Sequence, residues 1–531
     1  MLRHAAIISL SVVATSTARQ SLVHAFVRCR HEVHFARNCA PTTTATVSLA
    51  DRRRRRRRRP QPQYLKGDND YIDATTTLND SESTTKLHNR FRRFRSSPHF
   101  APHIRRVVLL SDLHMDYTAN RDWLSNLCSP NGDVVVISSN ASNEIADIND
   151  MNTMMIVAGD VSHDLDILRW TFQTLKRKYG EVAYTPGNHE LWIDRDDNAD
   201  EDGSVQNTSI DKLERVLQLC LEENIRIGPM RVGGTDNTDN LQPALWVIPL
   251  LSWHHPSFDK EPPIECWGGI PSARKVVADY RRTRWPSPLS MMDDSIAHFM
   301  DSLNDIILDL DSIADLEATT MPATTTPTTM LTFSHFIPRI ELLPEKRYLS
   351  LPTLPRCVGS TFLESRLRRM GEKYYNSARE NSDIGDSASN SDSYINRNND
   401  NNDTSGSVDS ASTNNLLSHH LHAFGHTHLA WDAIIDGVRY VHVPLAYPRE
   451  WEQRRRSLEI GTMKGEVGED RLPVCLWEQT PFCDSAGFPS KWLGGWWSKY
   501  YSVMPRKPHR NKELAPWVAK RFRSVKSRDI K

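Results

Sequence analysis

Five short clusters of polar residues in this sequence carry side chains that bind metal ions, and each cluster follows a short apolar run. Asp112 and His114 come directly after the run 107–110, and Asp160 follows the run 155–158. A GNHE motif, a single histidine and a GHTH motif follow three further runs. The candidate metal ligands in these clusters are Asp112, His114, Asp160, Asn188, His335, His426 and His428, and His189 lies beside Asn188.

These residue types suit a centre of two metal ions. A carboxylate such as Asp160 has two oxygens and can bridge two cations, neutral imidazoles suit Zn, Fe and Mn, and the Asn188 carbonyl adds a neutral hard ligand. Two cations about 3.5–4 Å apart can clamp a phosphate, lower the pKa of a bridging water and stabilise both oxygens of an in-line displacement. The residues therefore predict hydrolysis of a phosphate mono- or diester, with a metal-bound hydroxide as the nucleophile.

The order of the clusters is more informative than any one of them. A lone DxH or GD occurs by chance in many chains, and a lone buried histidine is more often a structural residue than a ligand. In open α/β sheets, ligands bind outside the carboxyl ends of the strands, so five clusters at five strand ends can converge on one site. We expect Gly159, Gly187 and Gly425 to let the backbone turn sharply where a strand ends and a ligand begins.

The segments between the clusters alternate between strand and helix patterns. Residues 165–179 and 210–223 place apolar residues at three- and four-residue intervals, which is typical of amphipathic helices. Asp436-Gly437 is a two-residue hairpin turn between the runs 433–435 and 438–443. The pattern predicts an α/β layered fold. Apolar runs suited to strands buried on both faces lie at 107–110, 155–158, 182–184, 245–251, 330–333 and 421–424.

The order D-x-H, GD, GNHE, H and GHTH resembles that of the calcineurin-like metallophosphoesterase superfamily, from about residue 107 to residue 450. The resemblance implies a layered β-sandwich-type core flanked by helices. It also implies that His189 protonates the leaving oxygen or steadies the transition state. His254, His255 and His298 are alternatives to His335. By the same resemblance, Asp112, His114, Asp160 and His428 hold one metal, and Asp160, Asn188, His335 and His426 hold the other.

The motifs differ from those of one branch of the superfamily. Serine/threonine protein phosphatases carry GDxxDRG, whereas Asp160 is followed here by Val161-Ser162-His163-Asp164, and Thr185-Pro186 replaces their Leu-Arg before GNHE. They also lack a GHTH. The chain is more similar to uncharacterised plant and algal metallophosphoesterases through the segments 111–117, 253–256 and 436–450. This likeness specifies no substrate beyond a phosphorylated small molecule or a phosphodiester.

The first residues resemble a targeting leader. Arg3 and His4 precede the apolar run 5–14, and small residues follow up to Ala18 or Ala25. The run is too short to cross a bilayer, which takes about 20 residues, so we expect processing and no stable membrane span. Ala25-Phe26 resembles the junction of presequences that enter algal complex plastids. We therefore expect entry into the secretory pathway, with a plastid or ordinary secretion as alternative destinations.

The rest of the chain divides by composition. The arginine run Arg52–Arg59 repels itself and marks a flexible segment, and polar residues dominate the insertions 198–207, 319–329 and 381–415. We expect polar insertions of this kind to be disordered, as we do the N-terminal leader. The expected domains are a leader at 1–50, a disordered basic linker at 51–103, the phosphoesterase domain at 104–450 and a basic, Trp-containing extension at 451–531.

Composition argues against several other classes of protein. Lys+Arg and Asp+Glu balance at 66 each, so net charge predicts no particular partner. Outside the leader the cysteines form no CxxC pair, which argues against a zinc ribbon or a dense disulfide framework. Two alternative functions remain. One is a catalytically idle metal-binding scaffold, which the intact His189 disfavours, and the other is a nuclease or nucleic-acid-binding protein that uses Arg52–Arg59.

A fluorescent protein fused behind residues 1–50 should enter the secretory pathway, and should reach a plastid if the Ala25-Phe26 junction is recognised there. Phe26→Ala should then hold the fusion at the step before the plastid. Microscopy in an algal cell with a complex plastid measures both, with the unfused fluorescent protein as control. A uniform cytosolic signal from the fusion contradicts both expectations.

Overall fold

The computed structural model describes residues 74–129, 150–193, 207–234, 244–310, 329–372, 420–451, 473–479, 488 and 495–524. The expected leader 1–50, the tract Arg52–Arg59 and the insertion 381–415 lie outside the described residues. The insertions 198–207 and 319–329 also lie outside them, except for Asn207 and Thr329.

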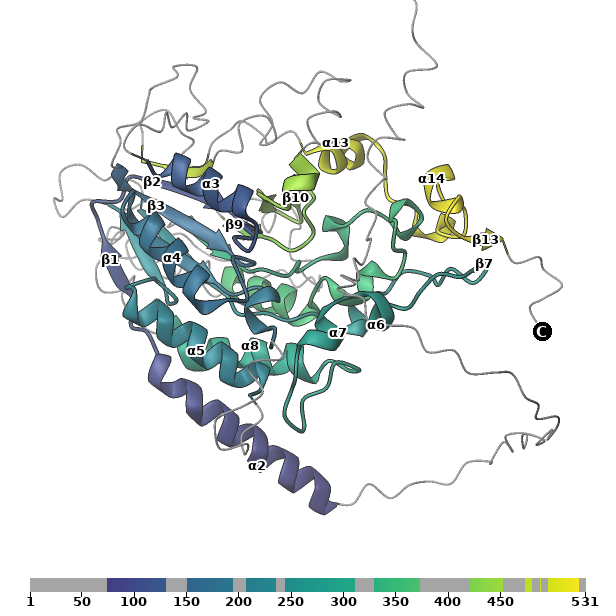
Figure 1. The fold of residues 1–531 in the computed structure, drawn as a ribbon, viewed down its shortest axis with the longest axis horizontal. Coiled ribbons are helices and arrows are strands. Elements are labelled where there is room, and N and C mark those ends of the chain that lie inside the picture. The colour runs from purple at the N-terminus through teal and green to yellow at the C-terminus, as the bar shows by residue number, and fades with distance from the viewer. Residues whose placement is uncertain are drawn as a thin grey trace, which may run out of the picture.

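Two β-sheets with helices around them form the core (Figure 1). One sheet has seven strands in the order β1-β5-β6-β8-β9-β11-β10, and the other has four in the order β12-β2-β3-β4. A single cluster of buried apolar side chains includes residues of both sheets, as expected for a layered α/β sandwich. The strands are β1 (His99–Ala101), β2 (Arg106–Leu110), β3 (Asp150–Ala158), β4 (Tyr179–Thr185), β5 (Met230–Gly233), β6 (Ala244–Pro249), β8 (Thr329–Phe333), β9 (His420–Phe424), β10 (Trp431–Ile435), β11 (Val438–His442) and β12 (Val474–Glu478).

Strand direction brings the ends of the central strands together. In the seven-stranded sheet β6, β8 and β9 run parallel, and in the four-stranded sheet β2, β3 and β4 run parallel. Their carboxyl ends therefore lie at a shared edge within each sheet. The strands predicted at 107–110, 155–158, 182–184, 245–251, 330–333 and 421–424 and the hairpin around Asp436-Gly437 are confirmed.

The two predicted amphipathic helices are α4 (Leu165–Lys176) and α5 (Ser209–Glu222), which pack on each other and follow one side of the sheets (Figure 1). Asp164 caps α4, and Thr208 and Asp211 form a capping box at the start of α5. The other helices are α2 (Ala74–Phe91), α3 (Thr118–Leu127), α6 (Ala273–Val276), α7 (Asp279–Arg282), α8 (Ser295–Ile307), α13 (Trp496–Val503) and α14 (Pro516–Ala519), and residues 361–372 and 448–451 are also helical.

Short elements complete the described structure. A two-stranded ribbon pairs β7 (Trp267–Gly268) with β13 (Arg523–Ser524). The 3-10 turns are η1 (Arg92–Phe94), η2 (His189–Leu191), η4 (Pro256–Phe258), η5 (Ile340–Leu342), η6 (Lys346–Tyr348), η7 (Leu354–Cys357) and η9 (Pro508–Arg510). Among the helices in the described ranges, none combines the length and the apolarity that a membrane crossing needs.

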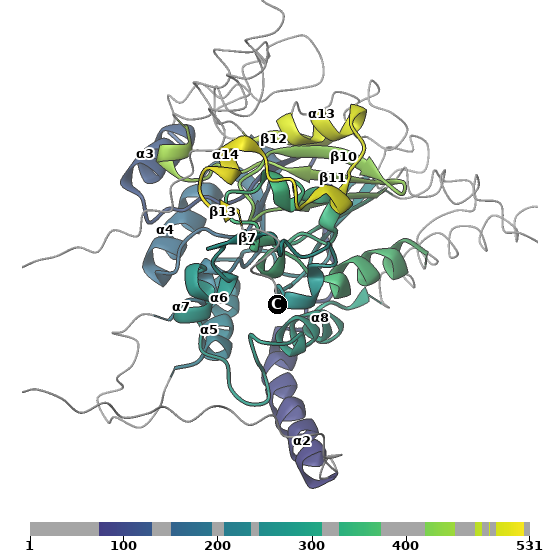
Figure 2. The same ribbon diagram turned by 90° about the vertical axis from the view of Figure 1, so that its right-hand side faces the viewer.

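Ordered structure extends beyond the expected core on both sides. Before Ile104, β1 pairs with β5, and α2 projects from the body at the end opposite α13 and α14 (Figure 2). Most of α2 is polar and gives no apolar period, but Phe91, its last residue, and Phe94 beyond it are buried. Beyond residue 451, β12 pairs with β2. The segments 74–103 and 473–479 therefore contribute to the two sheets and their packing, and the division into domains stays a prediction.

Two histidines of β9 lie inside the seven-stranded sheet. His420 Nε2 and His422 Nδ1 each lie 2.9 Å from Thr332 Oγ1, and His422 Nε2 lies 3.1 Å from Ser334 Oγ. Burial lowers the pKa of His420 to about 3 and the pKa of His422 well below its usual value. Both imidazoles are therefore neutral in the folded protein at neutral pH.

Replacing His420 with Gln should make the fold less sensitive to acid. Because the folded-state pKa is lowered, the unfolded chain takes up the proton first, and the free energy of unfolding falls as the pH drops from about 6.5 to about 3. One such histidine adds a slope approaching about 1.4 kcal/mol per pH unit. His420→Gln should remove that slope between about pH 6 and about pH 4.

Urea unfolding at several pH values measures the slope. His103→Gln is the matched control, because His103 is an exposed histidine. Equal slopes for the wild type and His420→Gln contradict the burial of a neutral imidazole at this position.

Candidate metal centre

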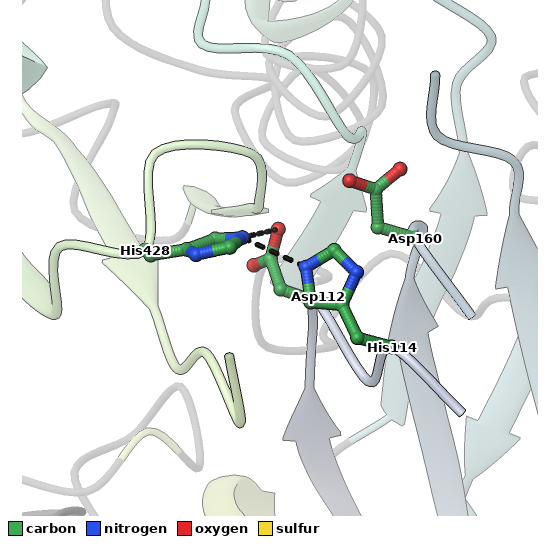
Figure 3. Close-up of side chains that lie close together, drawn as sticks. All are labelled: Asp112, His114, Asp160 and His428. Carbon is green, nitrogen blue, oxygen red and sulfur yellow. Dashed lines mark hydrogen bonds and ion pairs between the residues drawn. The ribbon is translucent and has the colours of Figure 1, made fainter. Parts of the chain in front are cut away.

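The candidate ligands come from the ends of five strands and converge between the two sheets. Asp112, His114, Asp160 and His428 form one group, shown in Figure 3, and Asp160, His335 and His426 form a second. Within each group, one nitrogen or oxygen atom of every residue lies within 4.8 Å of those of the others. Asp160 is common to both groups, so the structure brings together the residues that the sequence placed at separate strand ends.

Hydrogen bonds determine which ring nitrogens of the second group carry protons. His335 Nδ1 lies 2.9 Å from the carbonyl oxygen of Ala158, and His426 Nε2 lies 3.0 Å from that of Cys357. A carbonyl only accepts, so these two nitrogens carry the hydrogens and His335 Nε2 and His426 Nδ1 present lone pairs. The two lone pairs face each other across 3.2 Å.

Further lone pairs point at the same place. Asn188 Oδ1 lies 3.1 Å from His335 Nε2 and 2.9 Å from His426 Nδ1, and Asp160 Oδ1 lies 3.3 Å from His335 Nε2. Such a cluster of acceptors requires a positive charge at its centre, as a metal ion or as a bound proton. Burial alone would lower the pKa of His335, but the carboxylates of Asp160 and Asp112 outweigh it and raise the pKa to about 9. The residues present therefore fit a cation.

The first group has the same character. His428 Nδ1 lies 2.9 Å from Glu450 Oε2, so it carries the hydrogen and leaves Nε2 facing His114 Nε2 at 2.8 Å. Asp112 Oδ2 lies 2.9 Å from His442 Nε2. Burial would raise the pKa of Asp112, but the hydrogen bond with His442 and the charges of nearby histidines hold it well below its usual range.

The alternative histidines lie elsewhere. His254 Nε2 is 3.3 Å from Asp279 Oδ2, His255 Nδ1 is 2.8 Å from Ser257 Oγ, and the ring of His298 packs against Phe362. None of the three belongs to either group of the described structure. The geometry therefore favours His335 over them.

His189 lies beside both groups and belongs to neither. Its Nε2 is 3.7 Å from Asp160 Oδ2, and its backbone N–H donates to Asp160 Oδ1 at 3.0 Å. Its ring stacks on Trp192, with centroids 3.6 Å apart. His189 is therefore placed next to the candidate ligands with its ring held from one side.

The backbone at the candidate ligands is unusual. Asp112, His114, Asp160, His426 and His428 have φ values of 53°, 44°, 55°, 75° and 55°. Residues other than glycine rarely adopt this left-handed backbone region, and residues strained in this way cluster at functional sites. It turns each side chain away from its strand and towards the centre.

The expectation for the three glycines is partly wrong. Gly159 has a φ of 78° and makes the expected sharp turn, whereas Gly187 and Gly425 do not have a positive φ. At these two positions a side chain has no room. A Cβ on Gly425 would lie 2.6 Å from the Ala158 carbonyl oxygen, and one on Gly187 would overlap the Asp160 carboxylate. Close approach of the strand ends, rather than turning, requires glycine there.

Glu190 is a buried residue that the sequence did not single out. Its carboxylate accepts hydrogen bonds from the backbone N–H groups of Asp160, Val161, Ser162 and Gly187, at 3.1, 2.5, 3.1 and 2.7 Å. Burial and then the charge of Asp160 raise the pKa of Glu190 to about 7. Glu190 thus joins the loops that follow β3 and β4, although as the last letter of GNHE it could have been noticed.

His442, Glu450 and Asp279 were also missed. In the sequence, His442 lies within an apolar run suited to a strand, and Glu450 ends a segment similar to other metallophosphoesterases. Their contacts with Asp112 and His428 join segments far apart in the sequence. Their positions along the chain carried no signal of these contacts.

Comparison with known proteins agrees with the motifs. The family model described as calcineurin-like phosphoesterase matches residues 105–280. Acyl-carrier-protein phosphodiesterase PptH of Mycobacterium tuberculosis is 50% identical over 38 residues, which are 7% of this chain and 12% of that protein. The crystal structure of phosphopantetheinyl hydrolase PptH from the same organism aligns with 67% of this chain and 94% of that one, at 18% identity and a TM-score of 0.36.

The family match covers part of the chain. Residues 105–280 match a calcineurin-like phosphoesterase domain, and the resemblance read from the motifs is confirmed. The matched range contains Asp112, His114, Asp160 and Asn188 and ends before His335. The curated relative is matched over only 12% of its length.

Glu190→Gln should lower the free energy of unfolding. The amide can accept through one atom only, so its NH₂ end must face backbone N–H groups that have no other acceptor, which costs about 1–3 kcal/mol. Urea unfolding measures the loss. Glu214→Gln is the control, because Glu214 pairs with Arg90 and Arg93 near the surface, where such pairs contribute about 0–1 kcal/mol. An equal effect of both substitutions contradicts the role given to Glu190.

Proposed function

We propose that this protein hydrolyses a phosphate ester with two metal ions. Asp112, His114, Asp160 and His428 hold one ion, and Asp160, Asn188, His335 and His426 hold the other. The single observation that supports this most strongly is the convergence of possible ligand atoms in two groups that share Asp160. Imidazole, carboxylate and amide oxygen ligands together suit Mn, Fe or Zn.

The metal ions would act as Lewis acids that polarise the phosphoryl group and lower the pKa of a bound water. The protein's own residues position these ions. Asp160 belongs to both groups, while Ala158, Cys357 and Glu450 accept the outward N–H groups of three histidines. These contacts hold the imidazoles so that their lone pairs point inward before any metal binds.

In this proposal, His189 acts on the leaving oxygen. Burial lowers its pKa, and the carboxylates of Asp160, Asp279 and Asp116 oppose that shift without reversing it. The neutral form is therefore favoured near neutral pH. A neutral imidazole can donate a hydrogen bond to the oxygen that gains charge, which favours stabilisation of the transition state over full proton transfer.

An aromatic and basic surface beside the first group could hold the organic part of the substrate. Tyr447 stacks on His114 with centroids 4.2 Å apart, Tyr117 contacts Tyr447 edge-on, and the Arg449 guanidinium lies 5.1 Å from the Tyr447 ring. Tyr117 is 46% exposed. PptH is named as a phosphodiesterase of acyl carrier protein, so we propose a phosphodiester of a carrier-bound or similar organic group as the first substrate class to test. The scaffold and nuclease alternatives predict no turnover and activity on nucleic acid, respectively.

Asp160→Asn and His189→Ala should fail in different ways. Asp160→Asn removes a negative charge between two cations, so metal content and activity should fall together. His189→Ala should keep its metal and lose about 10²–10⁴-fold in kcat. The loss should be smaller on nitrophenyl esters, whose leaving groups need little stabilisation. Elemental analysis and steady-state kinetics on phenyl and nitrophenyl mono- and diesters measure both properties.

His103→Ala is the control for the loss of a histidine, since His103 is exposed and outside both groups. A His189→Ala protein without metal would show that His189 is a ligand. Wild-type protein that takes up neither Mn, Fe nor Zn on reconstitution would contradict the proposed function itself.

A further inference from the structure

Asp279 is a buried carboxylate in the wall beside the candidate metal centre. It begins α7 and is 0% exposed. One oxygen, Oδ1, accepts from Asn188 Nδ2 and from Trp192 Nε1, both at 2.8 Å, and Oδ2 lies 3.3 Å from His254 Nε2. Within the described residues, Asp279 forms an ion pair with His254 and with no lysine or arginine. A carboxylate so placed is costly to bury, so packing alone does not explain it.

The contact with Asn188 determines which end of the amide faces the candidate ligands. Oδ1 of Asp279 accepts from the Trp192 indole N–H, which can only donate, and the same oxygen lies 2.8 Å from Asn188 Nδ2, so the NH₂ end of Asn188 points to Asp279. The carbonyl end then points the other way, towards His335 Nε2 and His426 Nδ1. A flipped amide would bring two oxygens together at Asp279 and would present an NH₂ group to a cation.

The contact with Trp192 reaches His189. The Trp192 ring is the surface on which His189 stacks, at 3.6 Å between centroids and 30° between planes. The Arg282 guanidinium lies 4.4 Å from the Trp192 ring and adds a second contact. The indole N–H bond to Asp279 therefore fixes the ring that supports His189.

We infer that Asp279 is a positioning residue that sets both the amide of the ligand Asn188 and, through Trp192, the ring of His189. The inference rests on the proposed function, because it assigns Asp279 a role in metal binding and turnover. One oxygen atom thus links the metal ligand to the group that acts on the leaving oxygen.

Three substitutions separate the effect of the Asp279–Asn188 contact from that of the Asp279–Trp192 contact. Asp279→Ala releases both Asn188 and Trp192, Trp192→Phe keeps the stacking surface but removes the N–H, and Asp279→Asn keeps a carbonyl that can accept from both. Asp432→Asn is the matched control, because Asp432 is a buried carboxylate that pairs with Arg439 on the β10–β11 hairpin. Each full-length protein is stripped of metal, titrated with Mn and assayed on phenyl and nitrophenyl phosphates.

Asp279→Ala should weaken one of two Mn sites by about 10–100-fold, as loss of a residue behind a ligand usually does, and leave the other site intact. Trp192→Phe should bind two Mn ions as the wild type does, yet lose more rate on phenyl than on nitrophenyl phosphate. Asp279→Asn should restore most of the Mn affinity that Asp279→Ala loses. Asp432→Asn should change neither readout.

Two Mn sites of unchanged affinity in Asp279→Ala, or a Trp192→Phe protein with wild-type dependence on the leaving group, would overturn the inference. So would an equal loss of Mn affinity in Asp432→Asn, which would trace the effect to stability. If Asp279→Ala does not fold, the leaving-group dependence of Trp192→Phe and the Mn affinity of Asp279→Asn still test the inference. A wild type without metal or turnover would instead refute the proposed function, so the two failures are distinguishable.

Discussion

The rest of the structure depends on how it holds several electron-rich atoms close to the buried carboxylate of Asp160. Lone pairs of His335, His426 and Asn188 gather beside the buried carboxylate of Asp160. His114 and His428 form a second group with the same carboxylate. Such an arrangement is repulsive unless positive charge occupies it. The rest of the fold holds these atoms together against that repulsion, because neither sheet alone supplies all of them.

Two kinds of interaction provide the necessary rigidity. Glu190 gathers the backbone N–H groups of two loops onto one carboxylate, and Gly187 and Gly425 remove the side chains that would separate the strand ends. The left-handed backbone at Asp112, Asp160 and His428 is retained because this surrounding network over-determines it. Backbone strain, a buried carboxylate and close backbone contacts together hold the candidate ligands at short distances from one another.

The sequence predicted what depends on local pattern. Apolar runs located the strands, intervals of three and four located α4 and α5, and residue types at strand ends identified the candidate ligands. It could not predict features that arise when distant segments meet. His442 and Glu450 acquire their roles only by contact with Asp112 and His428, and the packing of α2 depends on Phe91 and Phe94 rather than on a period within the helix. The left-handed φ values likewise have no signature in the ligands' identities.

The pairing of β12 with β2 has a consequence for biosynthesis. β2 leads into Asp112, yet its partner on one side is a strand near the other end of the chain, and Arg106 and Glu478 are 372 positions apart. During translation, β2 and β3 leave the ribosome long before β12 exists, so the nascent four-stranded sheet has an open edge for most of synthesis. Within the two large sheets, the strand that precedes the first candidate ligand is therefore the one whose neighbours are completed last. The sheet that carries Asp112 and Asp160 is complete only when β12 has been synthesised.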